Sequence, residues 1–170
     1  MKSAKTKSRK ILLIGIGNDS RGDDGLGWLF LDALKDEFSD MMDFEYKFQL
    51  QVEDADLLAK YDVVIFVDAT EKQYANGFSI EPCEAASEYF YSSHLQSPQA
   101  VLYLAQTLYN AWPDTYLIAI SGKSWELGQK PGKQAIRNLN KAIEAFRHLW
   151  IRNQLNQKFQ SLTKETYANV

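Results

Sequence analysis

The chain has little of what several classes of protein depend on. Cys83 is the only cysteine among 170 residues, which excludes an internal disulfide and a cluster of thiolate metal ligands. No apolar run approaches the about 18 residues that a membrane-spanning helix needs. The formal net charge is −3, so no general positive field attracts nucleic acid or anionic lipid. These absences favour a cytoplasmic protein that binds neither nucleic acid nor a membrane.

The length is typical of a single domain with a sizeable core. Residues 1–9 are rich in lysine and arginine, and we expect them to form a disordered basic leader. A signal peptide is excluded because the following apolar stretch is short, contains two glycines and lacks a small-residue cleavage site. Residues 10–152 are expected to form one α/β/α domain, followed by a polar C-terminal tail at 153–170.

Apolar strands alternate with amphipathic helices along this domain. The β-branched run at 63–68 predicts a central strand buried on both faces, and the strict alternation at 44–50 predicts a strand near the sheet edge. Further strands are predicted at 10–16, 77–81 and 116–120, and helices at 24–38, 53–60, 98–110 and 133–151. Residues 83–97 read mostly as a loop. The alternation predicts a three-layer α/β/α sandwich around a mostly parallel sheet.

The segment 11–28 carries the first candidate site. An apolar strand leads into Gly15, Gly17 and Asn18, and the acids Asp23 and Asp24 follow at the start of a helix. A dinucleotide fingerprint is excluded because its third glycine is replaced by serine. The glycines suit a tight turn, and one of the acids can cap the helix. Two adjacent carboxylates also repel each other, which a bound cation relieves.

Two further candidates are expected at the same sheet edge. Asp68 ends the central strand, and His94 lies in the loop before the helix at 98–110. Together with Asp24, they offer two carboxylates and an imidazole, a donor set that suits a first-row transition metal. The alternatives are a capping or turn role for Asp68 and an incidental role for His94. His148, on the last helix, is expected to be structural or solvated.

The order of these motifs resembles that of the hydrogenase maturation endopeptidases, from Ile11 to about Gly128. The resemblance rests on four segments: Gly15-Ile16-Gly17-Asn18 with Asp23-Asp24-Gly25-Leu26-Gly27, Phe66-Val67-Asp68-Ala69, Ser93-His94, and Ser124-Trp125-Glu126. It implies a phosphorylase/hydrolase-like sandwich with a twisted sheet of about five strands. It also implies a metal-dependent endopeptidase that removes the C-terminal extension of a nickel–iron hydrogenase large-subunit precursor once nickel is inserted.

The resemblance further implies roles for individual residues. Asp24, Asp68 and His94 are the expected metal ligands, with nickel delivered within the substrate, and either carboxylate is a candidate for catalysis. A monomer is expected. The remaining candidates, as substrate-binding or loop residues, are Gly15, Gly17, Asn18, Asp23, Gly25, Ser124 and Glu126.

Two alternatives stay open at this point. Relatives often carry Pro-Glu after the last strand, where this chain has Gly122-Lys123, so a degenerate relative that binds a metalloprotein without cutting it is one alternative. The other is a receiver-like phospho-acceptor domain, since Asp23-Asp24, Asp68 and Lys123 imitate its acids and lysine. The spacing argues against a receiver, because about seven residues separate the first strand from its acid pair.

Overall fold

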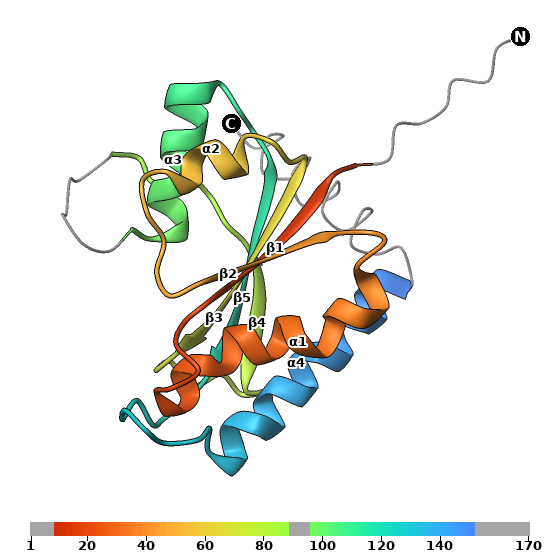
Figure 1. The fold of residues 1–170 in the computed structure, drawn as a ribbon, viewed down its shortest axis with the longest axis vertical. Coiled ribbons are helices and arrows are strands. Elements are labelled where there is room, and N and C mark those ends of the chain that lie inside the picture. The colour runs from red at the N-terminus through yellow and green to blue at the C-terminus, as the bar shows by residue number, and fades with distance from the viewer. Residues whose placement is uncertain (1–8, 89–95, 152–170) are drawn as a thin grey trace, which may run out of the picture.

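The computed structural model describes residues 9–88 and 96–151 and contains a twisted five-stranded sheet (Figure 1). The strands are β1 (Ile11–Ile16), β2 (Asp43–Lys47), β3 (Val63–Thr70), β4 (Phe78–Pro82) and β5 (Asp114–Ser121). Their order across the sheet is β2-β1-β3-β5-β4. All neighbouring strands are parallel except β4, which pairs antiparallel with β5 at one edge. The predicted α/β fold with a mostly parallel sheet is therefore confirmed.

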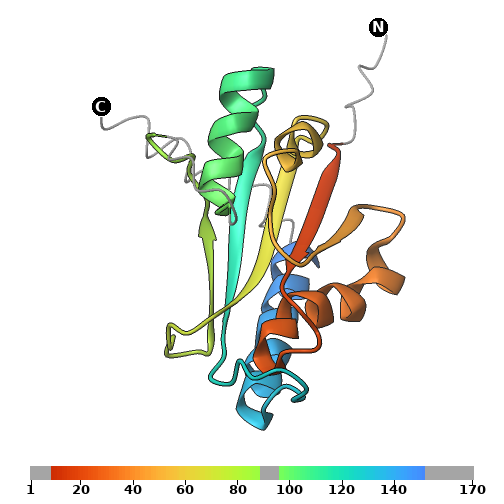
Figure 2. The same ribbon diagram turned by 60° about the vertical axis from the view of Figure 1, so that its left-hand side comes forward.

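Helices cover both faces of the sheet (Figure 2). On one face lie α1 (Leu26–Phe38) and α4 (Lys133–Ile151), packed against alternate strand residues such as Leu13 and Val67. On the other face lie α2 (Asp54–Leu58) and α3 (Pro98–Tyr109), packed against the intervening residues such as Phe66. Because successive strand side chains point to opposite faces, one run of apolar residues builds both cores. No helix in the described part of the chain is long and apolar enough to cross a membrane.

The predicted elements agree with the structure apart from their ends. The edge position of β2 is confirmed, although the strand ends at Lys47 rather than at residue 50. The first helix begins as a 3-10 turn, η1 (Gly22–Gly25), which leads directly into α1. No side chain caps η1 or α1, so the interpretation of Asp23 or Asp24 as a helix cap was wrong.

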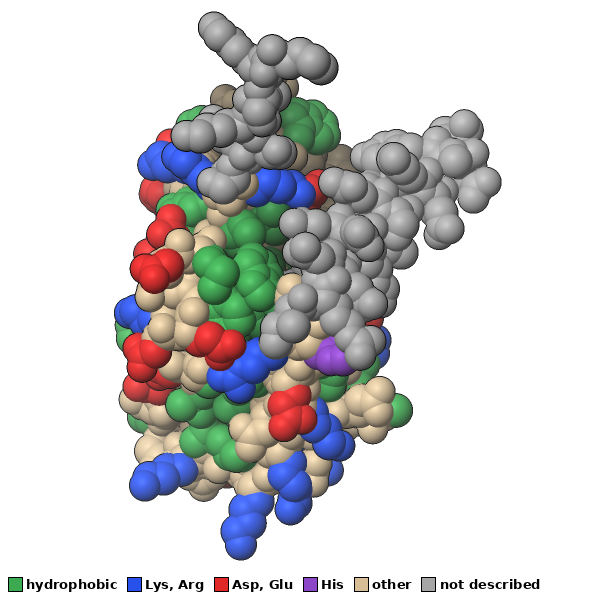
Figure 3. Space-filling view, turned by 90° about the vertical axis from the view of Figure 1, so that its right-hand side faces the viewer, with side chains coloured by type: hydrophobic (Ala, Val, Ile, Leu, Met, Phe, Trp, Pro, Cys, Tyr) green, Lys and Arg blue, Asp and Glu red, His purple; other side chains and the backbone are tan. Residues whose placement is uncertain are grey.

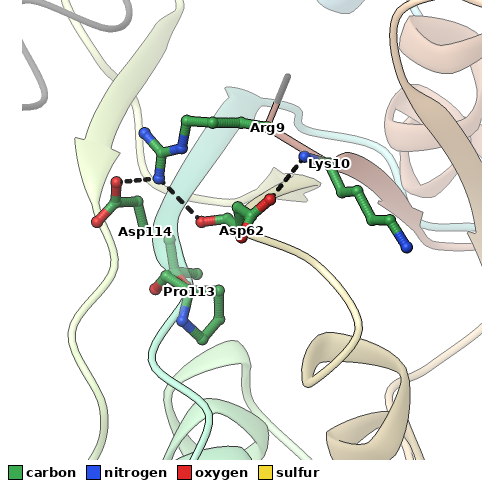
Figure 4. Close-up of polar contacts among 6 residues, drawn as sticks. Arg9, Lys10, Asp62, Pro113 and Asp114 are labelled. Atoms are coloured by element: carbon green, nitrogen blue, oxygen red, sulfur yellow. Dashed lines mark hydrogen bonds and ion pairs between the residues drawn. The ribbon is translucent and has the colours of Figure 1, made fainter. Parts of the chain in front are cut away.

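The amino-terminal ends of β1, β3 and β5 are fastened by Arg9 (Figure 4). Its guanidinium donates to the Asp62 carbonyl at 3.0 Å and forms an ion pair with the Asp114 carboxylate. The backbone N–H of Lys10 donates to Asp62 Oδ2 at 2.8 Å. A hollow of about 490 Å³ lies at this end of the sheet, with Trp112 in its lining. Residues 1–8 of the predicted leader, and the predicted tail, lie outside the described residues.

Candidate active site

The turn after β1 places Asp24 over the carboxyl end of the sheet. Gly17 has φ +135°, and a Cβ atom there would lie 1.8 Å from the Asp24 carbonyl oxygen. That carbonyl accepts a hydrogen bond from the N–H of Asn18 at 3.2 Å. The chain therefore closes on itself at a point where only glycine fits, which gives the glycine of the motif a physical reason.

Close packing between β1 and the following helix explains two more glycines. A Cβ at Gly15 would lie 2.7 Å from the Gly27 carbonyl oxygen. A Cβ at Gly25 would lie 2.9 Å from the Cα of Asp19. Gly15, Gly17 and Gly25 thus shape the loop that carries Asp24, which is a backbone role.

Asp23 fastens this turn to the loop after β5. The side chain is only 2% exposed. Its Oδ2 accepts from the N–H groups of Lys123 at 2.7 Å and Ser124 at 3.0 Å, and its Oδ1 accepts from Gly132 at 2.7 Å. Three N–H donors compensate the burial of the negative charge. Both Asp23 oxygens thus bind this chain's own backbone and hold the loop, and its predicted role toward substrate stays a prediction.

The same contacts overturn the reason for expecting a cation at Asp23-Asp24. Backbone N–H groups already compensate the charge of Asp23, and the charge of Asp24 acts on Asp68. The pair that interacts electrostatically is Asp24 and Asp68, which come from two different strand ends.

Asp68 lies at the topological switch point of the sheet. After β1 the chain continues to β2, which lies on one side of β1, whereas β3 lies on the other side. Pairing between β1 and β3 ends at Gly15 and Val67, and Asp68 is the next residue. β3 itself continues to Thr70 along β5, so Asp68 does not close the strand as predicted. Parallel α/β sheets bind ligands in the crevice at such a point.

Burial raises the pKa of both carboxyl groups. Desolvation raises the pKa of Asp68 to about 7; the Ala69 N–H opposes this shift, and the negative charge of Asp24 adds to it. Desolvation also raises the pKa of Asp24, which the nearby charge of Arg21 partly offsets. Two carboxyl groups that resist ionisation together are suited to sharing a proton or a cation.

His94 and Ser93 lie outside the described residues, so the predicted third ligand stays a prediction. Within residues 9–88 and 96–151, no three histidine, cysteine or acidic side chains are grouped as a metal site. Gln96 forms an antiparallel bridge with Leu50, in the segment that follows β2 at the same end of the sheet. Gln96, two residues after His94, therefore lies near the carboxyl end of the sheet.

The loop after β5 is held in place by its own polar side chains. Ser124 Oγ donates to Gln129 Oε1 at 2.9 Å, and Gln129 Nε2 donates to Glu126 Oε2 at 2.6 Å. A Cβ atom at Gly122 would lie 2.7 Å from the Cβ of Asp23, which explains a glycine at this position. Ser124 and Glu126 therefore both bind Gln129 within this loop, and their predicted role toward substrate stays a prediction.

Sequence reasoning missed the contributions of Arg21 and Gly132. The Arg21 guanidinium donates to the Trp125 carbonyl at 3.3 Å and lowers the pKa of Asp24. The Gly132 N–H binds Asp23 across 109 positions of sequence. Backbone donors so far apart leave no spacing signal.

The comparisons with known proteins gave no match to a family model or a curated sequence, but they matched solved structures. The [NiFe] hydrogenase maturation protease HycI from Thermococcus kodakarensis is 25% identical, with a TM-score of 0.64 over 85% of this chain and 94% of that one. The hydrogenase maturating endopeptidase HybD from E. coli is 20% identical, with a TM-score of 0.65 over 84% and 93% of the two chains.

A third structure, the hydrogenase 2 maturation peptidase from a Thaumarchaeota archaeon, is 21% identical and has a TM-score of 0.61 over 84% of this chain. All three solved structures are peptidases of hydrogenase maturation, and this chain shares their fold. The chain is similar to hydrogenase maturation proteases, which are hydrolases, and this likeness confirms the resemblance predicted from the ordered motifs.

The receiver-like alternative was wrong. Receiver domains have a flavodoxin-like sheet, in which the strand order is 2-1-3-4-5. Here β5 lies between β3 and β4, and β4 is an antiparallel edge strand. The backbone N–H of Lys123 also binds Asp23, one of the two acids that the receiver interpretation required for a cation.

Proposed function

We propose that the chain is a metal-dependent endopeptidase that removes the C-terminal extension of a nickel–iron hydrogenase large-subunit precursor after nickel insertion. The observation that carries this proposal is the pairing of Asp24 with Asp68 at the switch point of the sheet. The likeness to maturation proteases over most of the chain supports the substrate class. A monomer acting in the cytoplasm is part of the same proposal.

The donor set fits a nickel ion carried by the substrate. Asp24 and Asp68 resist simultaneous ionisation, and a divalent cation between them removes that penalty. His94 is proposed as the third ligand, because imidazole together with carboxylates suits nickel better than magnesium. When bound, the ion supplies Lewis-acid polarisation of a peptide carbonyl.

The carboxyl groups can also handle protons. A group with a pKa of about 7, such as Asp68, is close to the value at which general acid–base catalysis works best near neutral pH. Asp68 is therefore proposed to accept a proton from the water that attacks the scissile bond. Arg21 favours the charged form of Asp24.

The decisive experiment is cleavage of a nickel-loaded precursor by the wild type and by the variants Asp24→Ala and His94→Ala. The matched controls are Asp36→Ala, an exposed acid on α1, and His148→Ala, the other histidine of the chain. We expect both site variants to lose cleavage and both controls to retain it. Cleavage that persists in both site variants contradicts the proposal.

Calorimetry with nickel provides a second readout. Nickel binding that is lost in His94→Ala, together with indifference to magnesium, supports the three-ligand site. A stable complex with an uncut precursor would instead favour the degenerate, non-cleaving relative that the Gly122-Lys123 segment suggested.

A further inference from the structure

Four exposed cations surround the turn that carries Asp24. We call Arg21, Lys123, Lys130 and Lys133 the basic rim. The ion pairs of residues 9–88 and 96–151 all involve other cations, such as Arg9, Lys47 and Arg147. The basic rim therefore has positive charges that no described carboxylate neutralises through an ion pair.

Backbone contacts place the lysines of the basic rim beside the site. The N–H of Lys123 binds Asp23, the immediate neighbour of Asp24. The residue before Lys130, Gln129, accepts the N–H of Gly22 at 2.9 Å. The residue before Lys133, Gly132, donates to Asp23. Each lysine thus makes, or directly follows, a contact with the Gly22 backbone or the Asp23 carboxylate, which holds its own backbone beside the turn.

The local charge contrasts with that of the whole chain. The formal net charge is −3, whereas residues 122–133 carry three lysines and one acid, Glu126, which hydrogen-bonds to Gln129. Positively charged side chains also gather at the lower end of the face shown in Figure 3, where α4 begins. A basic surface on an acidic protein attracts an anionic partner and raises its rate of association.

The composition of the loop indicates a polypeptide rather than a nucleic acid. Leu127, at 75% exposed, is the most exposed large apolar side chain of the described chain, and Trp125 beside it is half-buried. Cations next to an exposed aliphatic side chain suit a peptide that presents both acidic and apolar residues. Arg21 of the basic rim lies near the Asp24 carboxylate, whose negative charge repels a continuous phosphate backbone.

We propose that the basic rim binds an acidic stretch of the polypeptide that this site cleaves, and that it helps to set which precursor is accepted. This inference rests on the proposed endopeptidase function. The cations offset the repulsion that an acidic segment meets when it approaches two carboxyl groups.

Binding is tested first without any cleavage. The probe is a short fluorescent peptide of alternating glutamate and glycine, with a lysine–glycine peptide as its counterpart, measured by anisotropy. The variants are Lys123→Glu and Lys130→Glu, and the matched control is Lys141→Glu, an exposed lysine further along α4. We expect each rim variant to weaken binding of the acidic peptide by about three- to tenfold, and the control by less than about twofold. Added salt is expected to reduce the difference between the rim variants and the control.

Cleavage kinetics then separate the two proposals. Rim variants that raise the KM for the precursor while kcat stays unchanged support the basic rim as a specificity surface. Unchanged KM in both variants, or equal binding of the acidic peptide by wild type and rim variants, overturns it while the endopeptidase function stands. A wild type that binds the acidic peptide but leaves the precursor uncut overturns the endopeptidase function. Tighter rim-dependent binding of RNA or anionic vesicles overturns the polypeptide partner. Circular dichroism melting of each variant confirms that the fold is intact.

Discussion

Replacing Asp23 by alanine should release the loop after β5 from the turn that carries Asp24. The buried carboxylate accepts three backbone hydrogen bonds, from Lys123, Ser124 and Gly132. Hydrogen bonds to a charged group contribute about 1.5–3 kcal/mol each. The three do not add fully, because the freed N–H groups regain water when the loop detaches. We therefore expect a loss of about 3–5 kcal/mol in the free energy of unfolding.

Urea unfolding at neutral pH measures this loss. Asp19→Ala is the matched control, because it removes an exposed acid from the same loop whose side chain accepts only a 3.3 Å bond from Ser20 among the described contacts. The control should differ from wild type by less than about 0.5 kcal/mol. If Asp23→Ala is as stable as Asp19→Ala, the inferred contribution of the three backbone hydrogen bonds to Asp23 is refuted.

Three further predictions concern pH and packing. Burial raises the pKa of Asp68 to about 7 in the folded protein, from an ordinary value of 3.8, so the folded state binds the proton more tightly and loses stability as pH rises from about 4 to 7. Asp68→Asn should remove up to about 4 kcal/mol of that loss, so unfolding curves at pH 5 and 8 should diverge between the two proteins. Gly27→Ala should lower the free energy of unfolding by about 3 kcal/mol or more, because its Cβ would lie 2.4 and 2.5 Å from carbonyl oxygens of β1 and β3. A melting temperature near that of wild type would contradict this. Phe146→Ala should cost about 3–5 kcal/mol, since the ring is 1% exposed, whereas Phe48→Ala, at 66% exposed, should cost no more than about 1 kcal/mol in the same denaturant assay.

The element order and the layers were predictable because they follow from local patterns. The β-branched run that became β3 is buried on both faces, and the alternating segment that became β2 lies at the sheet edge, as expected. Hydrophobic periodicity reports which face of an element is buried, and this signal is present in consecutive residues. The ends were less predictable, since the 3-10 turn η1 depends on contacts with a loop about a hundred residues later.

The candidate site divides in the same way. The sequence by itself placed Asp24 after one parallel strand and Asp68 near the carboxyl end of another, and therefore placed both at one edge of the sheet. Only the tertiary structure decided that Asp23 binds three backbone N–H groups while the charge of Asp24 acts on Asp68. Two adjacent acids look equivalent in a sequence, because their difference depends on donors from Lys123, Ser124 and Gly132. Contacts between residues so distant along the chain exist only once the sheet has brought its strand ends together.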